Sequence, residues 1–579
     1  MIPRTWPGVL WAGLLTASLS AAEPPLVVLK GTDFVGGARE IFGSTYFGQT
    51  DVNYVYARST GAPSTMRATF SIPRLPPGAL FLFLTACDDD APSPCEIEVA
   101  LNGHVLFQGP SGFPNGAWAT RRIPLPDGIL RAGTHTLALT NRHETGPLGH
   151  PPWFMVARCA VAGRGYRPPE LGLSGGLKVK LPARRRPLPE PLPPGQTQPG
   201  FRIRGLKGWG WTPDQYLQEI PILARYKMNF LMNCYLSMYS HPSEWRNEWW
   251  QPLPEEKKRA YAEVIRRCRE YGLTFCFAKH PQLSSPRPLD PASDEDFEKL
   301  WPHFAWAQSQ GVKWFCLPLD DVEARVEQFR CVNKLFQRLR AADPEAQLIF
   351  CPSIYWGDGT NQPYLEALAR EVHPEVYVFW TGDGVVTPRI TRRAAESYKR
   401  VVRHRLILWD NYPVNDNHPT LHLGPVTGRD ADLCEVIDGY MSNPMCTQNQ
   451  ANRIPLLTCA DYAYNPKAYD PMRSIGQAIV HLARTAAQRR VLADLVEAYP
   501  GMLIFGGGTA TNPVRERFQR LMAEGRRGSA QRSLRRMEEL LARLKQQFPN
   551  QYPATRKTLA ADLAWMQNEF QKQFGGEGK

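Results

Sequence analysis

The sequence predicts an α/β protein whose main body is a (β/α)8 TIM barrel, preceded by an all-β sandwich and followed by a small helical domain. The chain has 579 residues, which is more than one hydrophobic core accommodates, so about three units are expected at about 100–200 residues each. In the middle of the chain, apolar strand-like runs alternate with amphipathic helical stretches. Short strand-like runs precede this part, and segments with helical periodicity follow it.

Residues 1–22 have the composition of an export signal. Arg4 supplies positive charge, an apolar run extends from Val9 to Leu19, and small residues precede Glu23. The apolar run is shorter than the roughly 20 residues that a membrane-spanning helix needs. We therefore expect a secreted or periplasmic protein with no membrane span after cleavage. An N-terminal membrane anchor is the alternative.

Residues 23–165 are expected to form a β-sandwich or jelly roll. Asn102-Gly103 separates two strand-like runs, which is typical of a tight β-hairpin. Other strand-like runs alternate with turns rich in Pro and Gly and include Ala79–Thr85, Cys95–Leu101 and Thr136–Thr140. Residues 166–200 follow as a linker rich in Pro and Arg, for which we expect extended structure.

Residues 201–470 predict the barrel, because strand and helix patterns alternate repeatedly. Seven strand candidates are Arg202–Gly205, Met228–Tyr235, Thr274–Lys279, Val312–Leu319, Gln347–Ser353, Val376–Trp380 and Leu406–Trp409. The eighth strand is either Ile454–Ala460 or Gly439–Ser442, and we prefer the second. An open doubly wound sheet is the structural alternative, but no Gly-x-Gly-x-x-Gly follows the first strand, which argues against nucleotide binding. Residues 471–579 are expected to be a helical C-terminal region.

The composition argues against two other classes of protein. The formal charge is +13, but much of the excess lies in local clusters such as Arg184 to Arg186, and no basic patch accompanies a nucleic-acid-reading motif. The chain has 12 cysteines without a Cys-x-x-Cys pair, so neither a zinc ribbon nor a redox motif is expected. Cys87 and Cys95 are close enough in sequence for a disulfide, although spacing does not establish one. We expect no metal and no cofactor.

The functional residues should lie where the barrel strands end, because barrel enzymes build their sites at the carboxyl ends of the strands. Strand 4 ends in Asp320-Asp321, and the segment WDNYPVND follows strand 7. Carboxylates, amides and aromatic rings together suit a sugar, whose hydroxyls and apolar faces they bind. Two adjacent carboxylates cannot both ionise without cost, so one can hold a proton for a leaving glycosidic oxygen.

At these residues the sequence resembles glycoside hydrolase family 84, the retaining β-N-acetylglucosaminidases that include O-GlcNAcases. The resemblance covers about residues 202–470. It rests on FAKHP, on Asp320-Asp321 and on four motifs in order, which are WDNYPVND, LGPVTGRD, YMSNPM and YAYNPKAYD. The family implies a retaining mechanism in which the substrate's own acetamido oxygen attacks the anomeric carbon and forms an oxazoline. Residues 23–165 lie outside the resemblance.

The resemblance also implies roles for individual residues. Asp320 would orient the acetamido N–H, and Asp321 would act as the general acid and then as the general base. The remaining residues would bind the sugar, and they are Gly208, Tyr355, Thr381, Asn411, Asp416 and Asn443. The last of these is the reason for preferring Gly439–Ser442 as the eighth strand, since Asn443 would then stand at its end.

Two family motifs are altered in this sequence. The first strand usually ends in an EGFYG-like motif, whereas here RGLKGWGWT is found and Lys207 stands at the position of the acid. The second strand usually supplies a lysine that holds a sugar hydroxyl, whereas MNFLMNCYLSMY contains none. Two alternatives to a hexosaminidase follow. One is a carbohydrate-binding relative that lost turnover, and the other is a lectin-like role for the β-sandwich, with the acidic segment from Asp88 to Cys95 as a candidate loop.

Overall fold

The computed structural model describes residues 24–36, 53–56, 65–88, 95–113, 118–143, 153–166, 168, 177–235, 238 and 247–575. The chain divides into two compact units, one within residues 1–170 and the other made mostly of residues 171–579. The expected export signal at residues 1–22 lies outside the described residues. Among the helices that are described, none combines the length and the apolar composition needed to cross a membrane.

The first unit contains two antiparallel sheets that enclose one apolar core. One sheet has the order β1-β9-β4-β7, with β2 also paired to β9, and the other has the order β3-β8-β5-β6. The strands are β1 Val27–Lys30, β2 Asn53–Tyr56, β3 Thr65–Ile72, β4 Leu80–Asp88, β5 Glu96–Leu101, β6 His104–Pro110, β7 Ala119–Pro124, β8 Gly133–Asn141 and β9 Trp153–Gly163. The expected all-β fold before the barrel is confirmed.

Local sequence explains two features of this unit. Asn102 and Gly103 have φ angles of 53° and 81°, the left-handed conformation that a tight hairpin requires, and they connect β5 to β6. Cys87 and Cys95 are both buried, and no disulfide joins them. Asp88 accepts a hydrogen bond from the Cys95 N–H at 2.8 Å. Residues 89–94 of the acidic candidate loop lie outside the described part of the chain.

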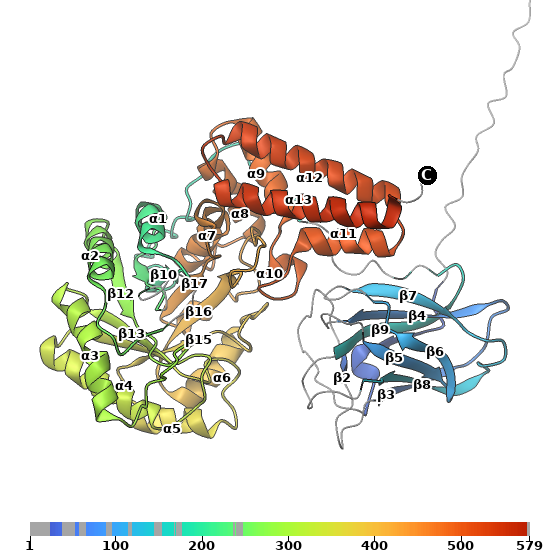
Figure 1. Ribbon diagram of the computed structural model, residues 1–579, viewed down its shortest axis with the longest axis horizontal. Coiled ribbons are helices and arrows are strands. Elements are labelled where there is room, and N and C mark those ends of the chain that lie inside the picture. Colours follow the sequence, from blue (N-terminus) through green and yellow to red (C-terminus); the bar gives the residue numbers. More distant parts are fainter. Residues whose placement is uncertain are drawn as a thin grey trace, which may run out of the picture. The chain divides into compact units, whose positions relative to one another are not determined.

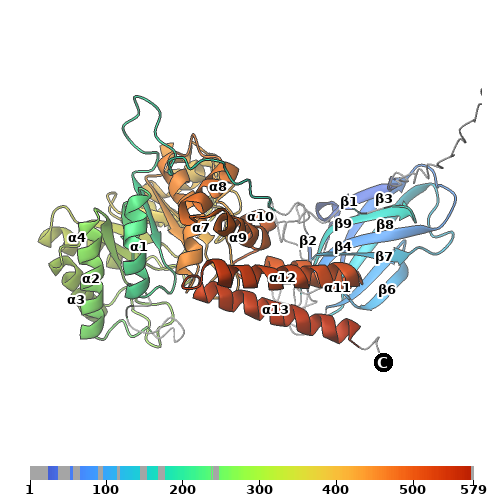
Figure 2. The same cartoon turned by 90° about the horizontal axis from the view of Figure 1, so that it is seen from above.

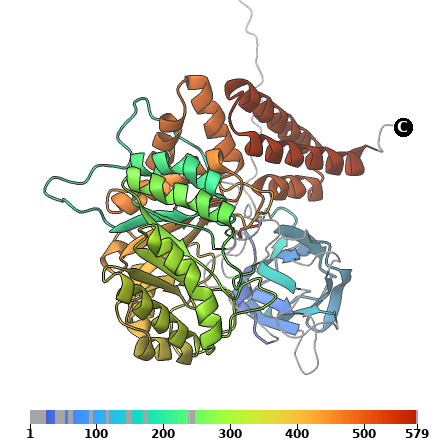
Figure 3. The ribbon, with the colours of Figure 1, turned by 60° about the vertical axis from the view of Figure 1, so that its left-hand side comes forward.

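The second unit is built on a closed barrel of eight parallel strands in sequence order, β10 to β17 (Figures 1 and 3). The strands are β10 Ile203–Lys207, β11 Phe230–Met232, β12 Thr274–Ala278, β13 Trp314–Pro318, β14 Gln347–Cys351, β15 Tyr377–Trp380, β16 Arg405–Pro413 and β17 Gly439–Asn443. Helices between the strands are α1 Pro213–Arg225, α2 Glu255–Glu270, α3 Asp294–Ser309, α4 Gln328–Ala342, α5 Pro363–Glu371 and α6 Arg392–Val402, and α7 Asn449–Tyr464 follows β17. The open-sheet alternative is excluded, and Gly439–Ser442 is confirmed as the eighth strand, since Ile454–Ala460 lies within α7.

Side-chain alternation along the strands forms two apolar layers. In β13, Phe315 and Leu317 belong to the core between barrel and helices, whereas Cys316 belongs to the core inside the barrel. The same alternation holds in β10, where Ile203 lies inside and Leu206 outside. Residues that share the inner face of a strand therefore reach the mouth of the barrel at its carboxyl end.

Residues 177–200 contain no helix or strand but belong to the second unit and pack against its helices. Leu177 and Val179 are buried in the core of the C-terminal helices, and the Glu190 N–H donates to Asp461 Oδ1 of α7 at 2.6 Å. This segment has no regular secondary structure, and side-chain and main-chain contacts hold it to the barrel and the C-terminal helices.

The C-terminal helices share a core that is separate from the barrel interior. They are α8 Pro471–Leu482, α9 Ala486–Ala498, α10 Met502–Phe505, α11 Pro513–Ala523, α12 Arg527–Gln547 and α13 Pro553–Phe574, and Figure 2 shows α12 and α13 lying side by side. α8 and α9 are separate helices, because Thr485 caps α9 by accepting a hydrogen bond from the Gln488 N–H.

Candidate active site

A cavity of about 90 Å³ opens where the barrel strands end. Its lining contains three carboxylates, one lysine, several aromatic rings and two amides, which come from both ends of the barrel sequence. The lining residues are Lys207, Trp209, Tyr235, Asp320, Asp321, Tyr355, Val385, Val386, Trp409, Asn411, Val414, Asp416, Asn443 and Thr509. Six of the eight predicted site residues are among them, so the structure brings together groups separated by more than 100 positions in the chain.

Asp320 and Asp321 follow β13 after Leu319. Strand alternation directs Asp320 inward, and it is 5% exposed. A second extended residue would point outward, but Asp321 has a φ of 57°, a left-handed conformation that costs a non-glycine residue about 1–3 kcal/mol. This turn allows both consecutive carboxylates to line the same cavity.

The two oxygens of the Asp320 carboxylate have different environments. The Tyr235 hydroxyl donates to Oδ2 at 2.7 Å, whereas Oδ1 is buried and has no hydrogen-bond partner among the described residues. Burial raises the pKa of Asp320, and the positive charge of Lys207 and the Tyr235 hydroxyl oppose that rise. One carboxylate oxygen is therefore fixed in place, and the other is available as an acceptor.

Asp321 lies nearer the mouth of the cavity. The Tyr355 hydroxyl donates to its Oδ1 at 2.7 Å. Protein atoms exclude part of the water around this carboxyl, and this loss of solvent, together with the negative charge of Asp320, raises its pKa. The Tyr355 hydrogen bond opposes the rise. A carboxyl with a raised pKa at the mouth of a cavity has the properties of a general acid.

His280 supports Asp320 from behind the cavity. Its Nε2 is 3.0 Å from the Asp320 carbonyl oxygen, and its Nδ1 accepts the main-chain N–H groups of Gln282 and Leu283. This pattern requires a proton on Nε2 and none on Nδ1. Burial lowers the pKa of His280 to about 3, so it remains neutral and acts as a structural histidine.

The opposite wall contains two amides that bind each other. Asn443, at the end of β17, donates through Nδ2 to Asn411 Oδ1 at 2.8 Å, and Asn411 donates through Nδ2 to the Val385 carbonyl at 2.7 Å. The Trp209 N–H donates to Asn443 Oδ1 at 3.3 Å. We call Asn411 and Asn443 the amide wall.

A buried ion pair stands behind this wall. Arg429 donates to both oxygens of Asp410, through Nη2 at 2.6 Å and through Nε at 2.9 Å. The Tyr440 hydroxyl donates to Asp410 Oδ2 at 2.8 Å. Asp410 directly precedes Asn411, so this bidentate pair fixes the backbone from which the amide wall projects.

Two predicted site residues do not line the cavity. Gly208 lies where an added Cβ would stand 2.2 Å from the Trp211 ring, so its small size serves close packing. Thr381 is buried, and its hydroxyl donates to the Gly384 carbonyl at 2.8 Å, which shapes the turn after β15. Both residues support the loops around the cavity and do not form its surface.

The alignment that placed Lys207 at the acid position of the EGFYG-like motif is wrong. The glycines of EGFYG are three residues apart, as are Gly205 and Gly208, so Arg204 occupies the position of the acid and Lys207 that of the tyrosine. Arg204 points away from the cavity, since its Nε donates to the Lys227 carbonyl at 2.9 Å. Lys207 shares the inner face with Ile203 and lines the cavity.

Sequence reasoning also missed Thr509, which lies between α10 and α11 in the C-terminal helical region. Its carbonyl oxygen is 3.0 Å from His422 Nε2, in the loop between β16 and β17. This hydrogen bond holds the residue beside the barrel, where Thr509 is part of the cavity lining. No periodicity or motif in the sequence connects this position to the strand ends.

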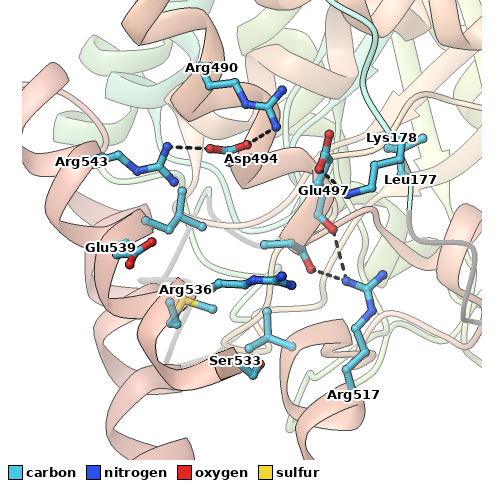
Figure 4. Close-up of a pocket in the computed structure, with 14 residues that line it drawn as sticks. Leu177, Lys178, Arg490, Asp494, Glu497, Arg517, Ser533, Arg536, Glu539 and Arg543 are labelled. Atoms are coloured by element: carbon cyan, nitrogen blue, oxygen red, sulfur yellow. Dashed lines mark hydrogen bonds and ion pairs between the residues drawn. The ribbon is translucent and has the colours of Figure 1, made fainter. Parts of the chain in front are cut away.

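A larger cavity of about 470 Å³ lies among the C-terminal helices (Figure 4). Part of its charge is paired, since Asp494 pairs with Arg490 and Arg543 at 2.8 and 2.7 Å, and Glu497 pairs with Lys178 at 3.1 Å. Size alone does not identify a reactive site, and the smaller cavity contains the adjacent carboxylates. Within the described part of the chain, no group of three or more His, Cys, Asp or Glu side chains is arranged to hold a metal ion.

Comparison with known proteins agrees with this geometry. Residues 202–496 match the family described as β-N-acetylglucosaminidase (NAGidase). Protein O-GlcNAcase from Mus musculus and its counterpart from Rattus norvegicus are each 24% identical over 279 residues. These matches cover 45% of this chain and 29% of each relative. Among solved structures, an O-GlcNAc hydrolase mutant from Thermobaculum terrenum aligns with a TM-score of 0.53 and 24% identity, over 64% of this chain and 83% of that one, which supports the fold.

Proposed function

Since the chain belongs to the β-N-acetylglucosaminidase family, glycoside hydrolase family 84, we propose that it is a secreted enzyme that removes terminal β-linked N-acetylglucosamine or a related 2-acetamido sugar. The substrate is a carbohydrate or glycoconjugate. No cofactor takes part in the proposed reaction. The chain spans 29% of the curated relatives it matches, so the proposal concerns the barrel and its cavity.

The observation that carries the proposal is the pairing of two unlike carboxylates. Asp320 Oδ1 is a buried acceptor without a hydrogen-bond partner among the described residues, which suits the N–H of an acetamido group. Asp321 has a raised pKa and lies nearer the mouth, which suits a proton donor to a leaving group. A single sugar ring with a 2-acetamido substituent presents both its amide and its glycosidic oxygen to such a pair.

The proposed reaction needs no nucleophile from the protein. Asp320 holds the acetamido N–H, and the acetamido oxygen attacks the anomeric carbon while the bond to the leaving oxygen breaks. Asp321 gives its proton to that oxygen, and the oxazoline forms in its protonated state, with the N–H still on nitrogen and bound to Asp320. Asp321 then takes a proton from water as the water oxygen attacks the anomeric carbon, which opens the oxazoline and restores the acetamido group. Two inversions at one carbon retain the β configuration.

A chromogenic assay tests this function. Purified protein should release nitrophenol from 4-nitrophenyl N-acetyl-β-glucosaminide, and NMR spectra should show the β-anomer of the free sugar as the first product. First appearance of the α-anomer would contradict retention. Absence of turnover, together with measurable binding of a thiazoline-type inhibitor, would favour the alternative of a carbohydrate-binding relative.

Export is a separate part of the proposal. It rests on the composition of residues 1–22 and on the small residues before Glu23. N-terminal sequencing of the mature protein should begin at Glu23. A mature chain that retains residues 1–22 would contradict cleavage and favour the N-terminal anchor.

A further inference from the structure

The floor of the cavity contains a buried lysine that the proposed reaction does not use. Lys207 is the last residue of β10, and its side chain points toward the barrel axis because Ile203 and Gly205 share its face. It is 1% exposed and lines the cavity. It is the one lysine or arginine among the described residues that form this lining.

Three aromatic rings surround the ammonium group of Lys207. Its Nζ lies 4.2 Å from the centre of the Trp409 ring, 4.5 Å from that of Trp209 and 5.0 Å from that of Tyr235. Within the described part of the chain, Nζ makes no hydrogen bond and no ion pair. The faces of the rings attract the positive charge, but they provide no oxygen or nitrogen acceptor for the three N–H donors of the ammonium group.

A second donor on this floor is also unsatisfied. The indole Nε1 of Trp409 is buried and has no hydrogen-bond partner among the described residues. Burying a polar group without a partner is unfavourable, and a ligand that supplies an acceptor removes this cost. Lys207 and Trp409 therefore favour a ligand that brings oxygen acceptors to the floor of the cavity.

The charge of the cavity indicates whether the ligand's acceptor oxygen is anionic or neutral. Three carboxylates line the cavity, and they are those of Asp320, Asp321 and Asp416. Lys207 is their one counter-charge, and burial lowers its pKa while Asp320 and Asp416 oppose that change. An anionic substituent would add repulsion to an already acidic cavity. A neutral sugar hydroxyl accepts a hydrogen bond without adding charge.

We infer that Lys207 is a specificity-determining residue whose ammonium group donates a hydrogen bond to a ring hydroxyl of the bound sugar. The inference rests on the proposed function, because it assumes that a 2-acetamido sugar occupies the cavity. Lys207 then selects among sugars by the position of that hydroxyl, while Asp320 and Asp321 act at the acetamido group and the glycosidic oxygen.

The test compares Lys207→Met with the natural protein on four substrates. These are 4-nitrophenyl N-acetyl-β-glucosaminide and its 3-deoxy, 4-deoxy and 6-deoxy analogues. On the complete sugar, Lys207→Met should lower kcat/KM by about 10- to 100-fold, as expected for loss of a hydrogen bond from a charged donor. On one deoxy analogue the two proteins should differ by less than about 3-fold, because the partner hydroxyl is already absent. An equal loss on all four substrates would overturn the inference.

Lys279→Met is the matched control. Lys279 follows β12, is fully buried and does not line the cavity, so it undergoes the same chemical change at another buried site. Any loss it causes should be uniform across the four substrates. If Lys207→Met does not fold, Lys207→Gln retains a neutral donor and should show the same pattern with a smaller loss.

Failure of the inference differs from failure of the proposed function. If the natural protein does not hydrolyse the complete sugar, the proposed function fails. Calorimetry with free N-acetylglucosamine and its deoxy analogues then measures the hydroxyl preference without turnover. A deoxy-dependent loss of affinity in Lys207→Met would still support the contact, and equal losses would reject it.

Discussion

The two walls of the cavity differ in how their polar groups are satisfied. On the amide wall, Asn443 binds Asn411, and Asn411 binds the Val385 carbonyl. Elsewhere in the lining, Asp320 Oδ1 has no hydrogen-bond partner among the described residues, and Lys207 makes no hydrogen bond or ion pair with them, although the charges of Asp320 and Asp416 act on it. Polar groups that already have hydrogen-bond partners contribute to the shape and stability of the cavity, whereas polar groups without partners are available to bind a ligand. Substitutions on the two sides should therefore affect different measurements.

The largest effect is expected from Asp321→Asn, which removes the proton donor from the prepared side. General acid–base catalysis contributes about 10²–10⁴-fold, so kcat/KM should fall by about 10³-fold on a substrate with a poor leaving group. The loss should be much smaller for a dinitrophenyl glycoside, because that leaving group needs no proton. Turnover that survives unchanged on the poor leaving group would contradict the role of Asp321.

A somewhat smaller effect is expected from Asp320→Asn. The amide has nearly the shape of the carboxylate but not its charge, so it stabilises the developing positive charge of the acetamido group less. Losing one such electrostatic contact costs about 10²–10³-fold in kcat. The loss should be similar for poor and good leaving groups, unlike that of Asp321→Asn. A strong leaving-group dependence would mean that Asp320 also transfers a proton.

Tyr355→Phe tests the hydrogen bond that adjusts Asp321. The variant should lose about 10-fold in kcat/KM near neutral pH, since one hydrogen bond to a charged group is removed. Because Tyr355 lowers the pKa of Asp321, its removal raises that pKa. Asp321 must carry a proton to act, so activity is lost as pH rises through its pKa, and the alkaline limb of the pH profile should move to higher pH.

The pH comparison depends on the other groups near these carboxylates. Those facing Asp320 and Asp321 are Lys207 on β10, Tyr235 after β11, His280 after β12 and Tyr355 after β14. His280 stays neutral through the range of interest, since burial lowers its pKa to about 3. An alkaline limb that does not move in Tyr355→Phe would assign that limb to a group other than Asp321.

The sequence predicted those parts of the fold and of the site that depend on repeated strand and helix patterns. Strand alternation and motif order predicted the eight strands, the choice of β17 and the convergence of Asp320, Tyr355 and Asn443. It was not informative where long-range packing decides. Thr509 is held at the cavity by long-range contacts of its loop, in which the His422 side chain binds the Thr509 carbonyl and the Thr420 hydroxyl donates to the Thr511 carbonyl. Lys207 was placed at the wrong position of the EGFYG-like motif. The alternation of side chains along β10 from Ile203 nevertheless predicts that Lys207 points into the barrel.

The smallest catalytic effect, and the clearest change in stability, is expected on the amide wall. Asn443→Ala removes two hydrogen bonds, one to Asn411 Oδ1 and one from the Trp209 N–H, and both lie in partly buried surroundings. This should lower the free energy of unfolding by about 1–3 kcal/mol, measured by urea denaturation with an unchanged slope. Lys207→Met should not destabilise the protein in this way, because it removes an unsatisfied cation. If Asn443→Ala instead left stability unchanged and abolished turnover, both walls would serve the ligand and the distinction between them would fail.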